Sequence, residues 1–329
     1  MGKKLVSIIM SVYNTEPKIL DQAIKSILNQ TYKNFEFIII DDNSDENIKG
    51  QIESYQDARI LFIQNKENLG LTKNLNKAIE LSNGCYIARM DADDISHEKR
   101  IEKQVTFLNN NSKVGIVGTN AKSIGISQKK IKMYSEHQDI KAQLLINSPM
   151  IHPSIMIRKS LLNENMYNES YRVAQDYELW SRLIWKTEFS NIQEELLFYR
   201  LHEKQVSNKR TKDHNYLIQD IRKKMWSKIS QNITSDELKL IKKSSSAAAL
   251  SEKELETLNL FSNVMIEKNL ISLNYANESL IKILSKNLDR AIYISTKTKG
   301  GFPKRKLKIK PKHYVNRFTI QKFFGFLIR

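Results

Sequence analysis

The chain has 329 residues, of which 40% are hydrophobic and 27% charged, a balance typical of folded proteins and not of disordered or membrane-spanning ones. Its formal net charge of +17 is uneven, because residues 1–110 carry 14 Lys and Arg against 16 Asp and Glu. This distribution argues against a uniformly basic nucleic-acid-binding protein, and we expect no nucleic-acid partner.

Apolar runs alternate with segments of helical periodicity in the first part of the chain. The helices carry apolar residues at spacings of three and four, as in Leu71, Leu75 and Ala78. The runs predicted as strands are 5–12, 35–40, 60–63, 85–88 and 114–117. This alternation predicts an α/β fold with a mostly parallel sheet and helices on both faces. The single cysteine, Cys85, lies in such a run, and we expect it in the core.

The pattern changes beyond residue 155. Strands are predicted at 155–157 and 196–200, with a helix over 177–184 between them. Beyond residue 213 the chain is predicted to be helical, as a C-terminal appendage with helices over 213–231, 235–243, 251–268 and 274–290. The Ser/Ala patch at 244–249 is predicted to connect two of these helices.

Polar residues follow three of the predicted strands. They are Ser11, Tyr13 and Asn14 after the first, Asp41 and Asp42 after the second, and Asp91, Asp93 and Asp94 after the fourth. Because ligands of open α/β sheets bind beyond the carboxyl ends of the strands, these side chains are candidates for one site. An aromatic ring can stack on a base, and clustered carboxylates suit Mg²⁺ or Mn²⁺. By itself the third group is equally typical of an exposed acidic turn or a helix cap.

No glycine-rich phosphate loop, paired-cysteine metal site or serine-nucleophile motif occurs in the sequence. Five segments instead resemble glycosyltransferase family 2 in their order and spacing. They are 7–14 (SIIMSVYN), 38–45 (IIIDDNSD), 68–74 (NLGLTKN), 88–94 (ARMDADD) and 175–182 (QDYELWSR). The resemblance covers about residues 5–210. It implies the GT-A fold, a nucleotide-diphosphate sugar donor and inversion at the anomeric carbon.

The resemblance also implies roles in donor binding. Asp42 or Asp41 would bind a uracil or thymine ring, and Tyr13 and the backbone near Val12 would line the base. Asp93 resembles the ligand of a Mn²⁺ or Mg²⁺ cofactor, and Asp91 would face the ribose or the donor sugar. The remaining implied donor-site residues are Asn14, Glu16, Ala92, Lys73 and Arg100, with His202 at the metal or diphosphate. Asp94 is expected to cap the following helix.

Asp176 falls where the family has its general base. Such a carboxylate would take the proton of the acceptor hydroxyl as that hydroxyl attacks opposite the metal. The alternative is that Asp176 only caps its helix. Three further residues are candidates for the acceptor site, namely His152, Glu178 and Trp180.

The chain ends in a basic tail, residues 299–329, with ten Lys and Arg and no acid. Cations interleaved with phenylalanines predict an anchor on an anionic membrane surface; the alternative is that these aromatics pack on the protein. The predicted division is a GT-A catalytic domain over 1–212, with a nucleotide-sugar half at about 1–118 and an acceptor half at about 119–212. A helical appendage over 213–298 and the basic tail follow.

We therefore expect an inverting transferase of a hexose or N-acetylhexosamine, with UDP as the expected carrier. The acceptor is expected to be a glycan, lipid-linked, in capsule or cell-surface polysaccharide synthesis. The enzyme is expected in the cytoplasm, at the inner face of the membrane. A homo-oligomer is a further possible partner state. The alternatives are a transferase extending O-glycans on a secreted adhesin, a nucleotidyltransferase, and a non-catalytic glycan- or membrane-binding module.

Overall fold

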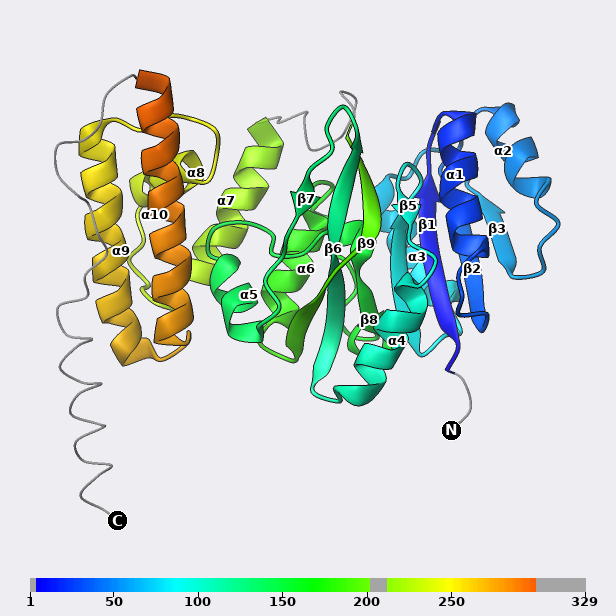
Figure 1. The fold of residues 1–329 in the computed structure, drawn as a ribbon, viewed down its shortest axis with the longest axis horizontal. Helices are drawn as coiled ribbons and strands as arrows, with labels where there is room; N and C mark the ends of the chain where they lie inside the picture. Colours follow the sequence, from blue (N-terminus) through cyan, green and yellow to red (C-terminus); the bar gives the residue numbers. More distant parts are fainter. Residues whose placement is uncertain (1–3, 202–211, 300–329) are drawn as a thin grey trace, which may run out of the picture. The chain divides into compact units, whose positions relative to one another are not determined.

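A computed structural model describes residues 4–201 and 212–299, which form two compact units (Figure 1). The first unit comprises the described residues of 1–140 and 148–218. The second, helical unit comprises 141–147 and the described residues from 219 onward. The sequence-based division began the appendage at 213, whereas the contacts divide the chain after Ile218 and add the separate segment 141–147.

A mixed sheet occupies the first unit (Figure 1). Its order along the hydrogen-bonded path is β3-β2-β1-β4-β8-β6-β9-β5, and β7 pairs with β6. The strands are β1 Val6–Val12, β2 Phe35–Asp41, β3 Ile60–Gln64, β4 Tyr86–Asp91, β5 Ile95–Ser96, β6 Val114–Gly125, β7 Lys130–Ile131, β8 Met156–Arg158 and β9 Glu188–Leu201.

The N-terminal half of this sheet is parallel. β1 pairs in parallel with β2 and β4, and β2 pairs in parallel with β3. β8 then runs antiparallel to both β4 and β6, while β6 and β9 are parallel. The predicted, mostly parallel sheet is confirmed. The predicted strands at 114–117 and 196–200 are parts of the much longer β6 and β9.

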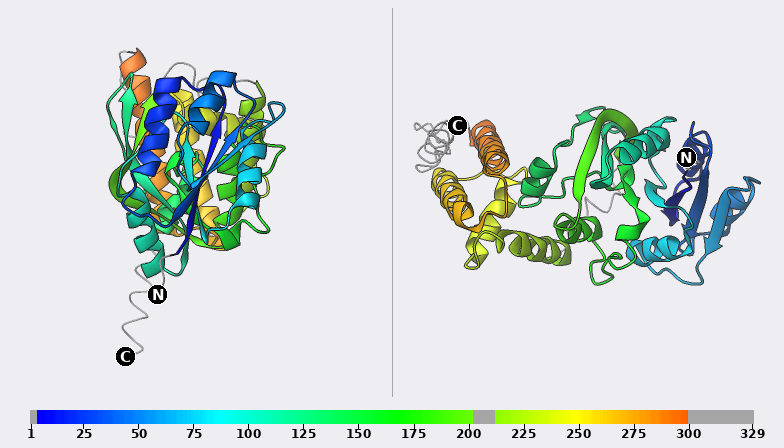
Figure 2. Two further views of the ribbon diagram at one scale, coloured as in Figure 1. Left: turned by 90° about the vertical axis from the view of Figure 1, so that its right-hand side faces the viewer. Right: turned by 90° about the horizontal axis from the view of Figure 1, so that it is seen from below.

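Helices cover both faces of the parallel half (Figure 2). α1 begins with Pro17 at its first turn and buries Leu20, Ala23, Ile24 and Ile27 against one face, where α4 also packs. α3 covers β1 and β2 from the other face. The helices of this unit are α1 Pro17–Leu28, α2 Glu46–Glu53, α3 Leu71–Leu81, α4 Arg100–Asn110, α5 His137–Gln143 and α6 Gln175–Leu183, with 3₁₀ turns η1 His152–Ser154 and η2 Lys159–Leu161.

The helical unit is built from α8 Ser235–Ser244, α9 Glu252–Ser272 and α10 Asn277–Lys299, together with the end of α7 Lys212–Trp226. α8 and α9 both begin with capping boxes, formed by Thr234 with Glu237 and by Ser251 with Glu254. The Ser/Ala patch lies between α8 and α9, so the predicted helix connection is confirmed.

The expectation that Cys85 is buried was wrong. Cys85 is exposed and precedes the first residue of β4. Its backbone N–H donates to the carbonyl of Leu5, and its own carbonyl accepts the N–H of Lys159. Among the described helices, none combines the length and the hydrophobicity needed to cross a bilayer.

Candidate functional site

The strand register brings three polar strand ends together. β1 is the central strand of its parallel group, and Val12 pairs with Asp41 of β2. One residue earlier, Ser11 pairs with Asp91 of β4. The ends of β1, β2 and β4, whose polar residues were predicted to form one site, are therefore neighbours at one edge of the sheet. This edge is the usual position of ligands in open α/β sheets.

The aspartates after β4 form a compact cluster of oxygen donors. One carboxylate oxygen from each of Asp91, Asp93 and Asp94 lies within 4.8 Å of the others. Asp91 and Asp93 are half-buried, whereas Asp94 is buried. Burial, reinforced by the charges of Asp91 and Asp93, raises the pKa of Asp94 well above its usual range. A hard divalent cation such as Mg²⁺ or Mn²⁺ fits this all-oxygen donor set.

Asp94 is not a helix cap, contrary to expectation. Its Oδ1 accepts the backbone N–H of Arg200 at 2.8 Å, and α4 begins only at Arg100, after Lys99. Asp94 Oδ2 is buried and has no hydrogen-bond partner among the described residues. A buried carboxylate oxygen without a donor is costly, so a cation beside it would be stabilising.

The end of β9 holds the acidic turn in place. Arg200 donates from Nε to the carbonyl of Asp93 at 2.8 Å and from Nη2 to Gln22 of α1 at 2.7 Å. Tyr199 is half-buried, and burial, followed by the charges of the aspartate cluster, raises its pKa. His202 follows within two residues but lies outside the described residues.

A buried arginine lies beside the cluster. Arg89 is 3% exposed and forms an ion pair with Asp91, two residues further along the same strand. Because side chains alternate along a strand, both residues project from the same face of β4. Burial raises the pKa of Asp91, and the Arg89 guanidinium opposes this shift. Sequence analysis missed Arg89, although a cation inside an otherwise apolar strand is a visible signal.

The turn after β1 combines an exposed ring with a fixed backbone. Tyr13 is 55% exposed, whereas Val12 is buried, so only the ring of Tyr13 and the backbone can meet a ligand. Asn14 has a φ of +46°, and two hydrogen bonds hold it. Its N–H donates to Ser44 Oγ, and its Oδ1 accepts the N–H of Asp45. Glu16 is exposed before α1.

Asp41 and Asp42 are buried, and each already accepts hydrogen bonds from the protein. Asp41 accepts from the Ser44 N–H at 3.1 Å and from Gln64 Nε2 at 3.0 Å. Asp42 accepts the N–H groups of Leu69 and Gly70 at 2.8 and 2.9 Å, and Asn65 Nδ2 at 3.0 Å. Asp42 therefore fixes the loop that leads into α3. Sequence analysis missed Asn65 as a partner of Asp42.

The three other donor-site candidates differ in accessibility. Lys73 is exposed in the first turn of α3. Ala92 is buried between the aspartates. Arg100 is fully buried, and its guanidinium donates to the carbonyls of Pro153 and Arg89 at 2.6 and 3.3 Å. The predicted diphosphate contact of Arg100 does not fit this geometry, because a side chain without exposed surface cannot reach a ligand.

Asp176 stands at the start of α6, half-buried. The helix is preceded by Ala174, which has a φ of +57° and makes no capping hydrogen bond with its side chain. The Asp176 carboxylate itself accepts the backbone N–H of Tyr177 in the first turn, so the interpretation of Asp176 as a helix cap stays beside the catalytic one. Ser148 Oγ donates to Asp176 Oδ2 at 2.9 Å. Burial raises the pKa of Asp176, while the hydrogen bond from Ser148 and the charge of Arg89 oppose this rise. The charge of Asp176 in turn raises the pKa of Asp91, so the two carboxylates lie within electrostatic reach.

The predicted acceptor residues are mostly parts of the core. Trp180 has no exposed surface and packs edge-on against Phe189 and His152. His152 Nε2 and the Tyr167 hydroxyl are 2.7 Å apart, and burial lowers the pKa of His152 well below its usual range. Glu178 is buried and pairs with Arg182 at 2.8 Å. Direct acceptor contact by these three residues does not fit, because their side chains are enclosed by protein.

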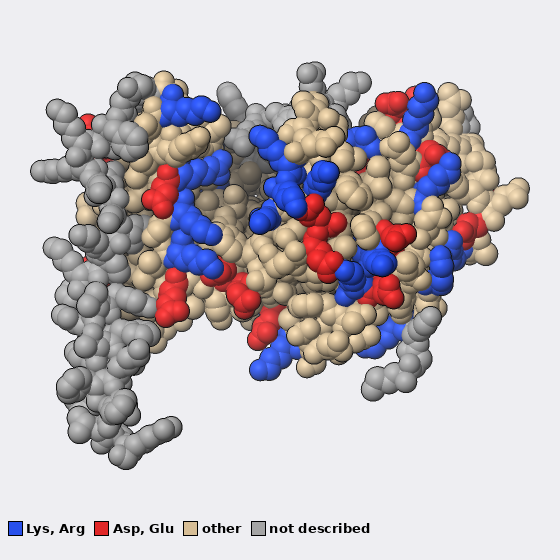
Figure 3. Space-filling model, in the orientation of Figure 1, with Lys and Arg blue, Asp and Glu red and all other residues tan. Residues whose placement is uncertain are grey.

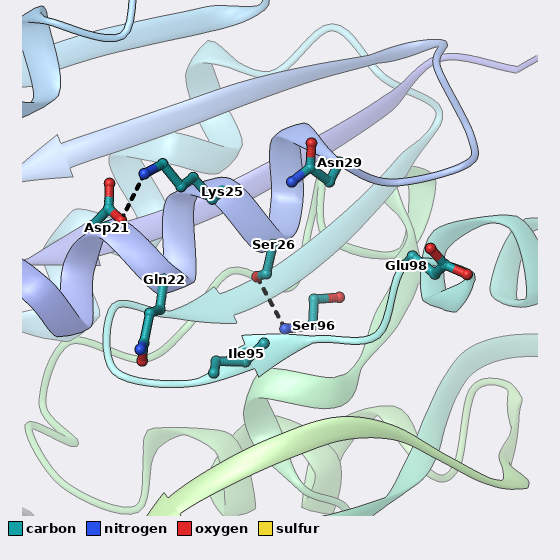
Figure 4. Close-up of a pocket in the computed structure, with 8 residues that line it drawn as sticks. All are labelled: Asp21, Gln22, Lys25, Ser26, Asn29, Ile95, Ser96 and Glu98. Atoms are coloured by element: carbon teal, nitrogen blue, oxygen red, sulfur yellow. Dashed lines mark hydrogen bonds and ion pairs between the residues drawn. The ribbon is translucent and has the colours of Figure 1, made fainter.

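A shallow pocket of about 350 Å³ opens between α1 and β5 (Figure 4). The Ser96 N–H donates to Ser26 Oγ across it, and Lys25 pairs with Asp21 on α1. None of the three clustered aspartates lines this pocket. Its lining residues are Asp21, Gln22, Lys25, Ser26, Asn29, Ile95, Ser96 and Glu98.

Comparison with known proteins gives consistent results. The family model described as "Glycosyl transferase family 2" matches residues 7–166. An uncharacterised glycosyltransferase of Methanocaldococcus jannaschii is 37% identical over 209 residues, which cover 61% of this chain and 72% of that protein. The O-antigen biosynthesis glycosyltransferase WbnJ of Escherichia coli is 35% identical over 209 residues, with coverage of 61% and 81%.

Solved structures show the same fold at low sequence identity. S. aureus TarS 1–349 in complex with UDP-GlcNAc superposes with a TM-score of 0.61 and 16% identity, covering 91% of this chain and 93% of that one. At this level of identity the likeness concerns the fold.

Proposed function

The chain belongs to glycosyl transferase family 2 and has the GT-A fold, and from this premise we propose that it is a metal-dependent, inverting transferase of a hexose or N-acetylhexosamine. The donor would be a nucleotide-diphosphate sugar carried by UDP. The observation that carries this proposal is the pairing of an acidic cluster after β4 with Asp176 on α6, within electrostatic reach of each other.

The nucleoside would bind where β1 and β2 end. The exposed Tyr13 ring offers a stacking surface. Its neighbour Val12 pairs with Asp41 and accepts the N–H of Asp42 at its carbonyl. Asp42 already accepts three hydrogen bonds, so its role would be shared between shaping the α3 loop and accepting a base N–H. UDP-GlcNAc and UDP are the ligands of the TarS structures, which supports a uridine carrier.

The diphosphate would bind at the acidic cluster. Asp93, with Asp91 and Asp94, would hold Mn²⁺ or Mg²⁺, and His202 stays a proposed further ligand outside the described residues. The ion would neutralise the charge that develops on the departing nucleoside diphosphate. Lys73, exposed on the first turn of α3, would add a cation to the same task.

Asp176 would act as the general base. The acceptor hydroxyl loses its proton to Asp176 while its oxygen forms the new bond to the anomeric carbon of the sugar. The bond from that carbon to the diphosphate oxygen breaks on the opposite face, so the configuration inverts and the nucleoside diphosphate leaves. Burial raises the pKa of the Asp176 carboxyl, against the hydrogen bonds from Ser148 Oγ and the Tyr177 backbone N–H, and a raised pKa suits a carboxylate that accepts a proton.

The acceptor would be a glycan, lipid-linked, in the synthesis of a cell-surface polysaccharide. The printed name of WbnJ, an O-antigen biosynthesis glycosyltransferase, supports this class of acceptor. The basic tail, residues 299–329, lies outside the described residues, and its composition supports a peripheral position at the inner face of the cell membrane. A homo-oligomer stays a prediction.

The test is release of free nucleotide from a panel of UDP-, GDP- and dTDP-sugars with Mn²⁺, followed for the wild type and for Asp93→Ala. We expect one UDP-sugar to be cleaved by the wild type and the rate to fall at least a hundredfold in Asp93→Ala, because the leaving diphosphate loses its counter-charge. Equal rates in the two proteins would refute the metal assignment. Equal thermal unfolding midpoints of the wild type and Asp93→Ala would show that the loss of activity does not come from loss of folded protein.

A further inference from the structure

Arg89 is a buried cation near the end of β4 whose guanidinium is only partly bound by protein. It forms the ion pair with Asp91, and both side chains project from the same face of the strand. Its Nε and Nη1 are buried and have no hydrogen-bond partner among the described residues. A buried cation with unused donors is costly, so packing alone does not explain an arginine at this position.

The backbone of Arg89 fixes where this charge lies. Its N–H donates to the carbonyl of Ile155 at 3.0 Å, and its own carbonyl accepts Nη2 of Arg100 at 3.3 Å. Ile155 and Arg100 are both buried, and Arg89 itself is 3% exposed. The guanidinium therefore cannot reach solvent without leaving a packed interior, and the cation is a fixed part of this strand end.

The second buried arginine of this region is bound differently. Arg100 donates to two carbonyl groups, those of Pro153 and Arg89, and burial lowers its pKa to about 10. Burial also acts to lower the pKa of Arg89, but the charge of Asp91 outweighs it and raises the pKa above its usual value. The contacts of Arg100 thus connect backbone segments, whereas Arg89 compensates the charge of a carboxylate.

The charge of Arg89 also acts on Asp176 of α6. Burial raises the pKa of Asp176, and the Arg89 guanidinium opposes this rise, together with the hydrogen bonds from Ser148 Oγ and the Tyr177 N–H. Asp91 of β4 and Tyr167, which precedes α6, are further ionisable groups within electrostatic reach of this carboxylate. Residues 89, 91 and 176 all belong to the first unit.

One fixed cation thus acts on both the acidic cluster and the proposed base. Asp91 and Asp176 repel each other, and repulsion between carboxylates is strong where little water screens it. A buried guanidinium that acts on both reduces this repulsion at a fixed position. Charge arranged in advance in this way needs no rearrangement during the reaction.

We propose that Arg89 is a positioning residue that holds the Asp91 carboxylate in the acidic cluster and stabilises the negative charge of Asp176. This inference rests on the proposed function, in which Asp176 is the general base. Arg89 would touch neither substrate, because protein encloses its side chain. Its effect would pass through the two carboxylates.

The test compares Arg89→Gln with Arg89→Lys. Glutamine keeps an N–H donor for Asp91 and loses the charge, whereas lysine keeps the charge without the planar guanidinium. In Arg89→Gln we expect the acid limb of the kcat/KM profile to move up by about one pH unit, because a carboxylate that loses a nearby cation has a higher pKa. Arg89→Lys should keep the acid limb of the wild type.

Rates and metal binding separate this role from a merely structural one. Below the acid limb kcat/KM of Arg89→Gln should fall about tenfold, and above the limb it should return toward the wild-type value. Mn²⁺ titration of the metal-free protein should give an affinity at least as high as in the wild type. The variant keeps a donor for Asp91 and removes a cation that repels the ion.

Arg59→Gln is the matched control. Arg59 pairs with Asp57, also two residues away in the chain, in the same unit. Loss of this pair should leave the acid limb and the Mn²⁺ affinity unchanged. Thermal unfolding midpoints of all variants show whether each protein is folded at the assay temperature.

Two outcomes overturn the inference and leave the proposed function standing. In the first, Arg89→Gln keeps the acid limb of the wild type while Asp176→Asn is inactive. In the second, the Mn²⁺ affinity of Arg89→Gln falls more than tenfold, which shows that the substitution acts through the metal and not through Asp176.

The lysine variant decides the question if Arg89→Gln fails to fold. A folded Arg89→Lys protein with the wild-type acid limb and at least a tenth of wild-type kcat/KM supports the inference, because a point charge then suffices. A shifted limb or a lower rate in this variant overturns it. An Asp176→Asn variant with more than a tenth of wild-type activity would instead refute Asp176 as the base, and with it both proposals.

Discussion

Asp42 is a residue with a defined structural role at the edge of the sheet where we propose that the nucleotide binds. Its carboxylate accepts two consecutive backbone N–H groups, those of Leu69 and Gly70, at the entry to α3. Gly70 has a φ of +85°, a conformation that costs glycine little. The loop thus closes onto the same edge of the sheet at which Tyr13 is exposed.

Replacement of Asp42 by asparagine tests this double role. The amide keeps one acceptor oxygen but turns an NH₂ group toward a protein donor, so at least one backbone N–H loses its partner. We expect unfolding free energy to fall by about 2 kcal/mol and UDP affinity to fall at least tenfold. Urea unfolding and calorimetric titration of UDP measure the two effects.

Asp57→Asn is the matched control, because Asp57 only pairs with Arg59 near the surface of the same unit. It should cost less than about 1 kcal/mol and leave UDP affinity unchanged. If both substitutions lower the unfolding free energy equally and neither changes UDP affinity, the proposed role of Asp42 in nucleotide binding is refuted.

Residue types were predictable from sequence, whereas their orientation was not. The aspartates at 91, 93 and 176 stand where their motifs placed them, at a strand end and a helix start. Arg100 and Trp180 carry suitable chemistry in the right region, yet their side chains are enclosed by protein. The apolar periodicity of a helix does not distinguish a buried arginine that donates to carbonyl groups from an arginine that faces a ligand, because both can occupy the same position in the pattern.

At the scale of elements, local pattern predicted best where contacts are local. The first four strands and their helices follow from alternating apolar runs, and β1 pairs with β2 and β4 in parallel, as expected of a mostly parallel sheet. The strands of the second half of the sheet were harder to predict from the sequence. β6 and β9 are more than sixty residues apart in the chain and pair with bulges, and β8 lies between β4 and β6. Such pairing depends on long-range contacts that no local period encodes.

The start of α9 carries a prediction at this scale. Glu254 closes the capping box with Ser251 and pairs with Lys243 of α8 at 2.6 Å, and this pairing lowers its pKa to about 2. Because the pKa of Glu254 is lower in the folded state than in the unfolded state, where it is near 4.5, its ionised carboxylate stabilises the fold at pH values above 4.5. This stabilisation is lost as the pH falls toward 2. Glu254→Gln should therefore lower unfolding free energy by about 1 kcal/mol at pH 7 and by less at pH 3.

Unfolding midpoints of both proteins at pH 7 and pH 3 measure this difference. Glu237→Gln, in the equivalent capping box of α8, is the control, because glutamine can also fill that position of the box. A deficit in Glu254→Gln that stays constant from pH 7 to pH 3 would contradict the assignment to an ionised carboxylate.

At the scale of the whole molecule, charge is segregated along the chain. All of the net positive charge of +17 comes from residues beyond 110, and the helical unit displays part of it. Lys and Arg gather over α10 (Figure 3), where Lys282, Lys286, Arg290 and Lys297 are exposed at spacings of four and seven. Exposed acids on the same helix, Glu278 and Asp289, reduce this charge without balancing it.

This arrangement supports the proposed membrane position, because the basic tail continues directly from α10. Each cation near an anionic bilayer contributes about 1 kcal/mol, and salt screens the attraction within a Debye length of about 10 Å. We expect the full chain to sediment with phosphatidylglycerol-containing vesicles at low salt and to be released at 0.5 M NaCl. Vesicles of phosphatidylcholine alone should bind far less.

Removal of residues 300–329 should abolish most of this binding. A triple variant that removes three cations from one face of α10 should weaken it about tenfold or more. Its substitutions are Lys282→Gln, Lys286→Gln and Arg290→Gln. The matched variant Lys18→Gln, Lys33→Gln, Lys66→Gln removes three exposed cations from the first unit. Because net charge falls equally in the two triple variants, a difference between them reports where the vesicle binds. Equal losses would mean that only net charge matters, and unchanged binding after removal of the tail would refute the anchor.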